Sequence, residues 1–386
     1  MHTAIDAFPI HIPEADLTDL ADRLARTRWP DAETVNDISQ GPQLARIRAL
    51  VARWQDGYDW RSTEAALNQW GSSRTVIDGL GIHFLHIRSP EPNATPLLLT
   101  HGWPGSVLEF RELIGPLTQP QAHGGLASDA FHLVIPALPG FGFSDKPTEP
   151  GWGVGRTAQA FAELMRRLGY GERWVAQGGD WGAAVTSALA HMRVPGLAGI
   201  HLNMVMFHPT QQEIADATPE EQQMLDDAAR YEKDYSGYMK LQCTRPQSVG
   251  FALADSPVGL ASWLYALFQD VSDTDGQPER TIAPDRLIDD VMMYWLTNTG
   301  PSSARFYWEG AREMAKGMST APLPLPLPAG ISVFPGEQMR LSERWAAARF
   351  ADLRFFGEAE RGGHFAAMEN PATLVEHLRA TFRTMI

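Results

Sequence analysis

Hydrophobic and polar positions divide the chain of 386 residues into an alternation of helices and strands. Apolar residues that recur every three or four positions indicate helices, and short apolar runs bounded by Gly or Pro indicate buried strands. The helical spacing predicts helices over residues 14–28, 43–56, 60–70, 157–168, 183–190 and 371–384. The apolar runs predict strands over residues 75–79, 82–87, 97–100, 131–136, 173–176, 197–202, 331–334 and 353–356. Such an alternation predicts the α/β class, with a mostly parallel central sheet that helices cover on both faces.

The same pattern divides the chain into four segments. Residues 1–92 are expected to form an N-terminal extension of helices and a strand meander, and residues 93–204 the first part of the core. Between residues 205 and 318 the strand pattern vanishes and Met, Trp, Tyr and Phe are frequent, which predicts a helical cap. The run Pro322–Pro328 is expected to be extended and stiff. It marks the return to the core, whose second part covers residues 319–386.

The segment Gly178–Gly182, with the sequence GGDWG, carries the strongest chemical signal. It lies between an apolar strand and a small-residue helix, which is the order of a nucleophile elbow, where a sharp turn lifts the nucleophile above the sheet. Asp180 stands where a serine esterase would have Ser. A carboxylate nucleophile suits displacement at an sp³ carbon, such as that of an epoxide or an alkyl halide. Taken alone, the segment also fits an Asp that only caps the following helix.

Two further segments place histidine next to glycine after an expected strand. His101–Gly105 resembles the His-Gly turn of the α/β-hydrolase fold, where a backbone N–H joins that of the residue after the nucleophile to form the oxyanion hole. Near the C-terminus, Arg361–Phe365 places His364 after two glycines, as in a loop that delivers the catalytic base. The order Asp180, acid, His364 matches the nucleophile–acid–base order of that fold.

Glu337 is the expected acid of this set. It follows the strand over residues 331–334, with Pro335 and Gly336 between them. Functional residues of open α/β sheets gather at the carboxyl ends of the strands, which favours this position. Asp352 is the alternative, but it precedes an expected strand instead of following one.

Charge and composition narrow the partners and the compartment. The formal net charge of −14 and the isoelectric point near 5.3 argue against nucleic acid or an anionic membrane as a partner. No apolar run approaches the roughly 20 residues of a membrane span, and the first residues lack the pattern of a signal peptide. Cys243 is the only cysteine, so no intrachain disulfide can form, which fits a cytoplasmic protein. The richness in Ala, Arg, Gly and Pro hints at a bacterial source.

His83 and His86 are the two histidines that could suggest a metal-binding site. Three residues apart in an expected strand, they point to opposite faces of a sheet and cannot hold one ion together. We therefore expect no metal, and nothing else in the sequence calls for a cofactor.

Taken together, these segments resemble the microsomal-type epoxide hydrolase family, including its soluble bacterial members, over nearly the whole chain. The segments that carry the resemblance are Phe8–Trp60, His101–Gly105, Gln177–Gly182, Ser236–Tyr238, Gln242–Pro246, Ala254–Leu260, Arg305–Tyr307, Phe334–Glu337 and Arg361–Ala367. The resemblance implies an α/β-hydrolase fold and an enzyme of the EC 3.3.2 type that opens an epoxide to a vicinal diol. The chain also looks similar to the epoxide hydrolases of enediyne antibiotic pathways, which implies a role in natural-product biosynthesis.

The resemblance implies a role for each matching residue. Asp180 attacks one epoxide carbon, while Tyr238 and Tyr307 from the cap hydrogen-bond the epoxide oxygen and donate a proton. The product is an alkyl ester of the enzyme. His364 then takes a proton from the water that cleaves this ester, and Glu337 orients the imidazole and stabilises its charged form.

Aromatic residues are expected to line the pocket. The backbone N–H groups of Trp103 and Trp181 should hold the ester oxygen as it becomes an oxyanion. The side chains expected to contact the substrate are Trp103, Trp181, Trp152, Phe207, Trp263 and Phe306. Such a lining favours a bulky apolar or aromatic epoxide as the small-molecule partner. The oligomeric state is left open, with a homodimer as one candidate.

Three other functions remain as alternatives. A haloalkane dehalogenase also has an Asp nucleophile followed by Trp, but halide needs no proton donor to leave, so Tyr238 and Tyr307 argue against it. A serine-type esterase is disfavoured because Asp180 occupies the elbow. A non-catalytic binding protein of this fold can lose the His or the acid, whereas here all the expected positions are filled.

Overall fold

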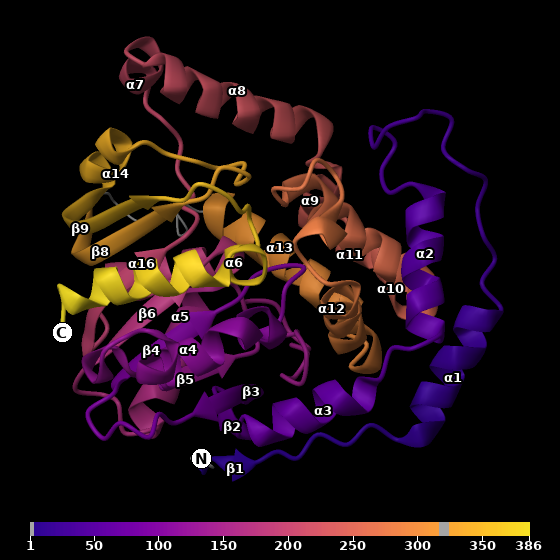
Figure 1. The fold of residues 1–386 in the computed structure, drawn as a ribbon, viewed down its shortest axis with the longest axis horizontal. Coiled ribbons are helices and arrows are strands. Elements are labelled where there is room, and N and C mark those ends of the chain that lie inside the picture. Colours follow the sequence, from indigo (N-terminus) through magenta and orange to yellow (C-terminus); the bar gives the residue numbers. More distant parts are fainter. Residues whose placement is uncertain (1–3, 316–323) are drawn as a thin grey trace.

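A twisted sheet with helices on both faces forms the body of the computed structural model, which describes residues 4–315 and 324–386 (Figure 1). Within these residues the sheet has nine strands in the order β1-β2-β3-β5-β4-β6-β7-β8-β9. The strands are β1 (Asp6–Ala7), β2 (Ser72–Ile77), β3 (Leu80–Ile87), β4 (Thr95–Thr100), β5 (Phe131–Pro136), β6 (Trp174–Gly178), β7 (Leu197–Leu202), β8 (Leu325–Val333) and β9 (Phe350–Glu358).

The sheet is antiparallel at one end and parallel elsewhere. β1, β2, β3 and β5 pair antiparallel in that order. β5, β4, β6, β7, β8 and β9 pair parallel, which confirms the predicted α/β class with a mostly parallel sheet. Because parallel strands end at one edge, the loops after β4, β6 and β8 lie close together.

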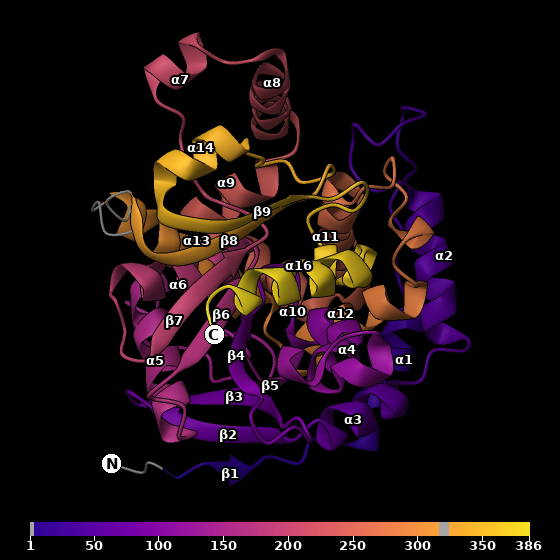
Figure 2. The same cartoon turned by 60° about the vertical axis from the view of Figure 1, so that its left-hand side comes forward.

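Helices of the core cover both faces of the sheet. α5 and α6 pack against each other on one face, and α4 and α16 lie over the other (Figure 2). The core helices are α4 (Ile114–Thr118), α5 (Val154–Arg167), α6 (Asp180–His191), α14 (Glu343–Arg349), α15 (Ala366–Glu369) and α16 (Pro371–Arg383), with short 3₁₀ helices η1 (Val107–Leu113), η2 (Pro120–His123) and η3 (Ala127–Asp129). No helix within residues 4–315 and 324–386 has both the length and the apolar composition that a membrane crossing requires.

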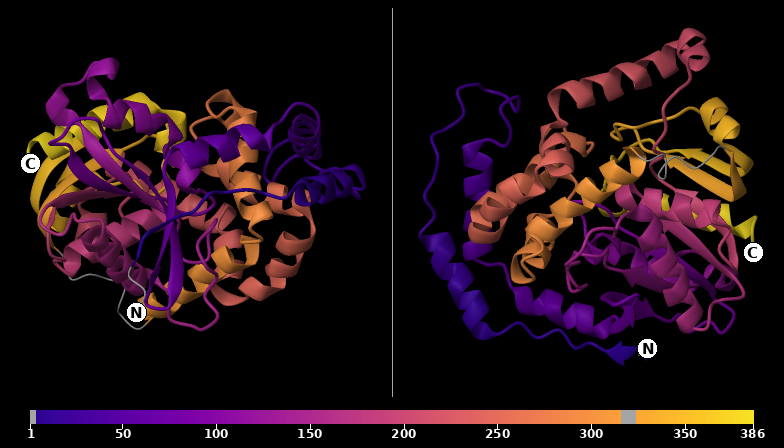
Figure 3. Two further views of the ribbon diagram at one scale, coloured as in Figure 1. Left: turned by 90° about the horizontal axis from the view of Figure 1, so that it is seen from below. Right: turned by 180° about the vertical axis from the view of Figure 1, so that it is seen from behind.

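A helical layer lies beside the carboxyl edge of the sheet, and the N-terminal helices wrap around its outer side (Figure 3). The helices between β7 and β8 are α7 (Gln211–Ala215), α8 (Pro219–Asp234), α9 (Gly237–Thr244), α10 (Pro246–Asp255), α11 (Pro257–Val271), α12 (Pro284–Leu296) and α13 (Gly300–Ala315), with the 3₁₀ helix η4 (Pro278–Arg280). The N-terminal helices are α1 (Glu14–Ala25), α2 (Leu44–Gln55) and α3 (Trp60–Gln69), and they contact α11 and α12.

The last two strands differ from the sequence expectation. β8 begins at Leu325, so the second half of the proline run is part of a strand and not only a connecting segment. The strand tolerates Pro326 because β7 pairs with β8 only from Ala329 onward. Residues 316–323 lie outside the described residues, so the expected boundary at 318/319 and the start of the proline run lie there too. The division of the chain at residues 92, 204 and 318 stays a prediction.

Asp352 also lies elsewhere than expected. It is inside β9, not before it, because this strand begins at Phe350. Its exposed carboxylate is paired with Arg354 at 2.8 Å. An exposed side chain within a strand, already bound by a cation, is poorly placed to orient a buried imidazole.

Candidate active site

Asp180 stands at the apex of a sharp turn between β6 and α6. Its φ angle is +47°, in the left-handed region that residues with a Cβ seldom adopt. The flanking glycines allow the close approach of strand and helix. A Cβ at Gly182 would lie 1.8 Å from the carbonyl oxygen of Thr100, and one at Gly178 would lie 2.1 Å from the carbonyl oxygen of Gly182. This local sequence therefore fixes the Asp180 carboxylate at the carboxyl edge of the sheet.

Backbone N–H groups face the Asp180 carboxylate. The N–H of Trp103, in the loop after β4, donates a 2.7 Å hydrogen bond to Asp180 Oδ1. The N–H of Trp181 also bonds the carboxylate and helps to lower its pKa. Gly102 leaves room for this contact, since a Cβ there would lie 2.1 Å from Asp180 Oδ1. The two N–H groups expected to form an oxyanion hole thus meet at one carboxyl group.

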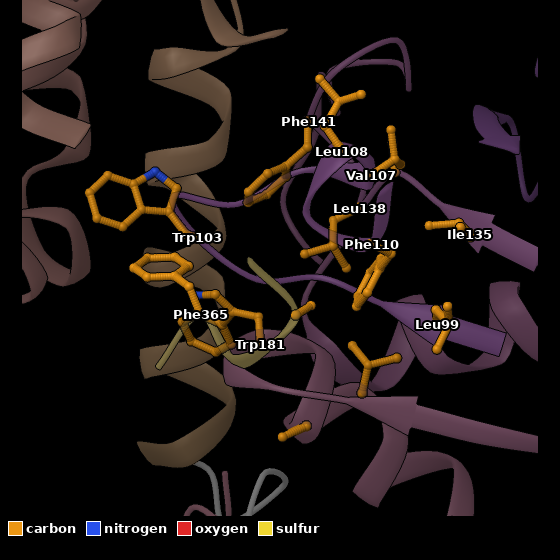
Figure 4. Close-up of a cluster of buried hydrophobic side chains, with 14 of the residues drawn as sticks. Leu99, Trp103, Val107, Leu108, Phe110, Ile135, Leu138, Phe141, Trp181 and Phe365 are labelled. Atoms are coloured by element: carbon orange, nitrogen blue, oxygen red, sulfur yellow. The ribbon is translucent and has the colours of Figure 1, made fainter. Parts of the chain in front are cut away.

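A packed apolar cluster supports this loop. Figure 4 shows Trp103, Trp181 and Phe365 together at the left of the cluster, with Leu99 of β4 and Phe110 of η1 further to the right. Trp103 is 1% exposed and Phe365 2% exposed, so the loop after β4 and the histidine loop are both anchored in the core. This packing limits the freedom of the groups around Asp180.

His364 lies between two carboxylates. Its Nδ1 is 2.8 Å from Glu337 Oε2, and its Nε2 is 3.7 Å from Asp180 Oδ2. Glu337 follows β8 and is 4% exposed. The backbone N–H of His364 donates to the carbonyl oxygen of Val271, which ties the histidine loop to the end of α11. The structure therefore brings together the three residues that the sequence predicted as nucleophile, acid and base.

These three groups shift one another's pKa. Burial raises the pKa of Asp180, and this effect exceeds the lowering by His364 and by the two N–H groups. Burial also raises the pKa of Glu337, but the charge and hydrogen bond of His364 bring it below the usual value. Burial lowers the pKa of His364, yet Glu337 and Asp180 outweigh it and raise this pKa to about 10. At neutral pH His364 is thus an imidazolium, which lies between the side chains of Glu337 and Asp180.

Two tyrosine side chains from the helical layer close the site opposite the sheet. The ring of Tyr238, on α9, stacks on the indole of Trp103 with 5.1 Å between centroids and an angle of 14°. The ring of Tyr307, on α13, lies edge-on to Trp181 at 4.9 Å and to Tyr238 at 5.9 Å. Burial raises the pKa of both hydroxyls well above the usual value. Both are therefore protonated at neutral pH and can donate hydrogen bonds.

The other expected pocket residues divide into two groups. Phe306 lies with the site, since its ring is edge-on to Trp181 at 5.1 Å. Trp263 donates its indole N–H to Gln242 at 3.0 Å, inside the helical layer.

Trp152 and Phe207 have other neighbours. The guanidinium of Arg156 lies over the ring of Trp152, and that of Arg349 lies over Phe207, whose ring also packs on Trp345. Neither ring contacts the Trp103–Trp181 pair among the ring contacts of the described residues, and their place in the substrate pocket stays a prediction. Their sequence neighbourhood gave no sign of these arginine partners.

The sequence interpretation missed Glu109, a buried acid beside the site. Glu109 lies in η1, and its Oε2 would be 2.4 Å from a Cβ at Gly105. Burial, with the nearby charge of Asp290, raises its pKa to about 8. Above that pH its charge contributes to the raised pKa of His364. A signal was present, because Glu109 interrupts the apolar residues Val107, Leu108 and Phe110 directly after the glycine turn.

The histidines considered for a metal have other partners. His83 Nε2 is 2.9 Å from Ser72 Oγ, and His86 Nε2 is 2.9 Å from the Tyr170 hydroxyl. Burial lowers the pKa of His83 to about 3 and that of His86 to about 4, so both are neutral. Their neutral rings are used in hydrogen bonds and ring packing within the fold.

The carboxylate turn, the His–Glu pair and the mostly parallel sheet define a hydrolase of the α/β-hydrolase fold, and the family model of that fold matches residues 95–247. A second family model, the epoxide hydrolase N terminus, matches residues 5–110. The chain belongs to the epoxide hydrolases of the microsomal type, as the sequence motifs predicted.

Relatives of known name agree with this assignment. A protein of Stigmatella aurantiaca whose name places it among the epoxide hydrolases is 54% identical over 99% of this chain and 85% of its own length. Epoxide hydrolase 1 of Sus scrofa is 31% identical over 97% of this chain and 88% of its own length. The crystal structure of juvenile hormone epoxide hydrolase from the silkworm Bombyx mori superposes with a TM-score of 0.91 at 29% identity and covers 99% of this chain and 95% of that one.

Proposed function

We propose that the chain opens a bulky apolar or aromatic epoxide to a vicinal diol through an alkyl ester of Asp180. The observation that carries the proposal is the surroundings of the Asp180 carboxylate. One oxygen accepts the N–H of Trp103, the other lies 3.7 Å from His364 Nε2, and the protonated hydroxyls of Tyr238 and Tyr307 lie on the side of the cap.

In the first step Asp180 attacks a ring carbon of the epoxide. A carbon–oxygen bond to Asp180 forms and the ring carbon–oxygen bond breaks. The alkoxide would be a poor leaving group at neutral pH, so one cap tyrosine donates its proton to the former ring oxygen. The negative charge moves from Asp180 to this tyrosine oxygen, and the total charge of the site is unchanged.

In the second step water attacks the carbonyl carbon of the ester. His364 takes the proton of this water, and the N–H groups of Trp103 and Trp181 stabilise the oxyanion. Alkylation prepares His364 for this role, because it removes the charge of Asp180, one of the charges that raise the pKa of His364. The imidazolium therefore gives up its proton more readily in the ester than in the free enzyme. This proton restores the cap tyrosine, and the neutral His364 can then take one proton from the attacking water. When the tetrahedral intermediate collapses, the bond between the acyl carbon and the alkoxide oxygen breaks. That oxygen takes the remaining proton of the water and leaves as the diol, so Asp180 is again a carboxylate and His364 an imidazolium.

The aromatic lining supports a bulky apolar substrate. Trp103 and Trp181 bond the carboxylate through their backbone, and their rings pack with Phe306 and the two cap tyrosines, which offer flat apolar surfaces rather than charged partners. A role in natural-product biosynthesis remains a further proposal. The gene neighbourhood tests it, since a polyketide or enediyne cluster would fix the substrate class.

Loss of the two cap hydroxyls tests the proposal against the dehalogenase alternative. We expect Tyr238→Phe and Tyr307→Phe each to slow alkylation, and the double variant to lose about 10²- to 10⁴-fold, the usual contribution of a general acid. Stopped-flow fluorescence with a styrene-oxide-like substrate measures alkylation, and a parallel assay measures halide release from haloalkanes. Unchanged alkylation in the double variant, or robust halide release by the wild type, would favour the dehalogenase.

A further inference from the structure

A third tyrosine hydroxyl lies behind the two cap tyrosines. The hydroxyl oxygens of Tyr231 and Tyr238 are 2.8 Å apart, within hydrogen-bond distance. Tyr231 belongs to α8, a helix that otherwise projects away from the body and buries only Glu221 fully (Figure 1). Tyr231 is therefore the point at which this exposed helix reaches the buried site.

The direction of this hydrogen bond follows from the chemistry of ring opening. A phenol has one hydrogen, and Tyr238 must direct it at the epoxide oxygen in order to donate it. The Tyr238 oxygen can then only accept a hydrogen bond from Tyr231. As the proton leaves, negative charge develops on the Tyr238 oxygen, and a hydrogen bond to a charged oxygen is stronger than one to a neutral oxygen. The contact is thus stronger in the transition state than before it.

The groups around Tyr238 raise its pKa, so a hydrogen bond that lowers this pKa favours proton donation. Burial, Tyr307 and the carboxylate of Asp180 all raise the pKa of Tyr238, whereas the hydrogen bond from Tyr231 lowers it. Burial, its hydrogen-bond partner Tyr238 and the more distant charges of Asp180 and Glu337 raise the pKa of Tyr231 well above the usual value. Tyr231 therefore keeps its proton at neutral pH and remains a donor.

We propose that Tyr231 is a positioning residue for ring opening, whose hydroxyl directs the Tyr238 hydrogen toward the epoxide oxygen and stabilises the phenolate that forms. The inference rests on the proposed function, because it needs Tyr238 to act as a proton donor. In this step the Tyr238 O–H bond breaks while an O–H bond forms on the former ring oxygen. Tyr231 keeps its own proton throughout.

The contacts that hold α8 against the core set the geometry of the Tyr231–Tyr238 hydrogen bond. At the start of the helix, Glu221 accepts hydrogen bonds from Ser342 and Arg344 at 2.5 Å each. At its end, Tyr231 meets Tyr238. The acidity of a cap tyrosine thus depends on a helix that is fixed to the core near its beginning.

A double-mutant cycle tests the inference. We expect Tyr231→Phe to slow alkylation of the wild-type enzyme roughly 3- to 10-fold, the effect of losing one hydrogen bond. We expect the same change to have no effect in a Tyr238→Phe background, because the oxygen that Tyr231 bonds is gone. The rate of ester hydrolysis should be unchanged, since Tyr231 does not act on the water.

Tyr235→Phe is the matched control. Tyr235 caps the C-terminal end of the same helix, with its ring 6.5 Å from that of Tyr231, and we expect wild-type rates. An effect of Tyr231→Phe that is equal in both backgrounds, or absent in the wild-type background, would overturn the inference. Failure of the proposed function looks different, because the wild type itself would then form no alkyl–enzyme in a single turnover.

Discussion

At the scale of single residues, the site is a balance of charges around His364. The imidazolium pairs with Glu337 on one side and with Asp180 on the other. Only the contact with Glu337 has the length of a good hydrogen bond, so Glu337 fixes the ring while Asp180 remains available to react. Because the pKa of Asp180 is raised, its carboxylate takes up a proton at a higher pH than an exposed Asp would, and the protonated form cannot attack. Alkylation should therefore fall as the pH is lowered.

Substitution of Glu337 and of Asp352 tests which of these two acids orients His364. We expect Glu337→Gln to slow ester hydrolysis by about 10²- to 10⁴-fold, because the imidazole loses both its orientation and its counter-charge. Asp352→Asn should leave the rate near that of the wild type, since that exposed carboxylate binds Arg354. Single-turnover decay of the alkyl–enzyme measures both variants, and the reverse result would assign the acid to Asp352.

Glu109 should affect the pKa of His364 without contacting the substrate. Its charge, which is present above about pH 8, raises the pKa of His364, so Glu109→Gln lowers that pKa. Because neutral His364 is the base, the part of the acid limb of ester hydrolysis that lies above about pH 8 should move to lower pH. Glu112→Gln, which removes an exposed acid of the same 3₁₀ helix, is the control and should leave the limb in place. A limb that stays fixed or moves to higher pH in Glu109→Gln would contradict this electrostatic role.

At the scale of elements, the turn from β6 into α6 determines where the nucleophile lies. We expect Gly182→Ala to destabilise the fold by about 1–3 kcal/mol or to prevent folding, because the new Cβ meets the backbone oxygen of Thr100 at 1.8 Å and backbone cannot move aside. Gly155→Ala on α5 is the matched change, since its Cβ would find Met192 at 3.8 Å. Denaturant unfolding compares the two, and equal stability would contradict the close packing of this turn.

The elements that the sequence predicted well are those with a strong local pattern. The strand, glycine turn and helix around Asp180 could be predicted because each needs particular residues at fixed spacing. β8 was predicted too short because Pro326 and Pro328 resemble a linker, and only the absence of a β7 partner before Ala329 makes a strand possible there. Tyr231 could not be predicted at all. It lies on a polar helix, and its contact with Tyr238 arises from how α8 and α9 fold together.

At the scale of the whole molecule, one buried carboxylate joins the N-terminal helices, the cap and the core. Asp289 of α12 accepts hydrogen bonds from Tyr58 at 2.7 Å and Thr63 at 2.6 Å. Its other oxygen pairs with Arg111 of η1 at 3.3 Å and with Arg286 at 3.2 Å. The Asp289 side chain is only 3% exposed, so water cannot take its place as the hydrogen-bond acceptor of these four partners. The three regions should therefore unfold together.

Asp289→Ala should be strongly destabilising. Removing the buried carboxylate leaves hydroxyls and a half-buried guanidinium without a partner, and we expect a loss of about 3–5 kcal/mol in the free energy of unfolding. Asp285→Asn breaks only the exposed pair with Arg53 and should cost about 1 kcal/mol or less. Urea unfolding followed by tryptophan fluorescence measures both. Equal effects of the two changes would show that Asp289 does not join the regions.

The most direct test of the covalent mechanism is one turnover in ¹⁸O-labelled water with enzyme in excess. Water attacks the ester carbonyl, so we expect one ¹⁸O atom in the carboxylate of Asp180 and none in the diol. After digestion with trypsin in ordinary water, mass spectrometry of peptide 174–193 reads the label without ambiguity, because Asp180 is its only Asp or Glu. Label found in the diol, with this peptide unlabelled, would mean that water attacks the epoxide directly and that no ester of Asp180 forms.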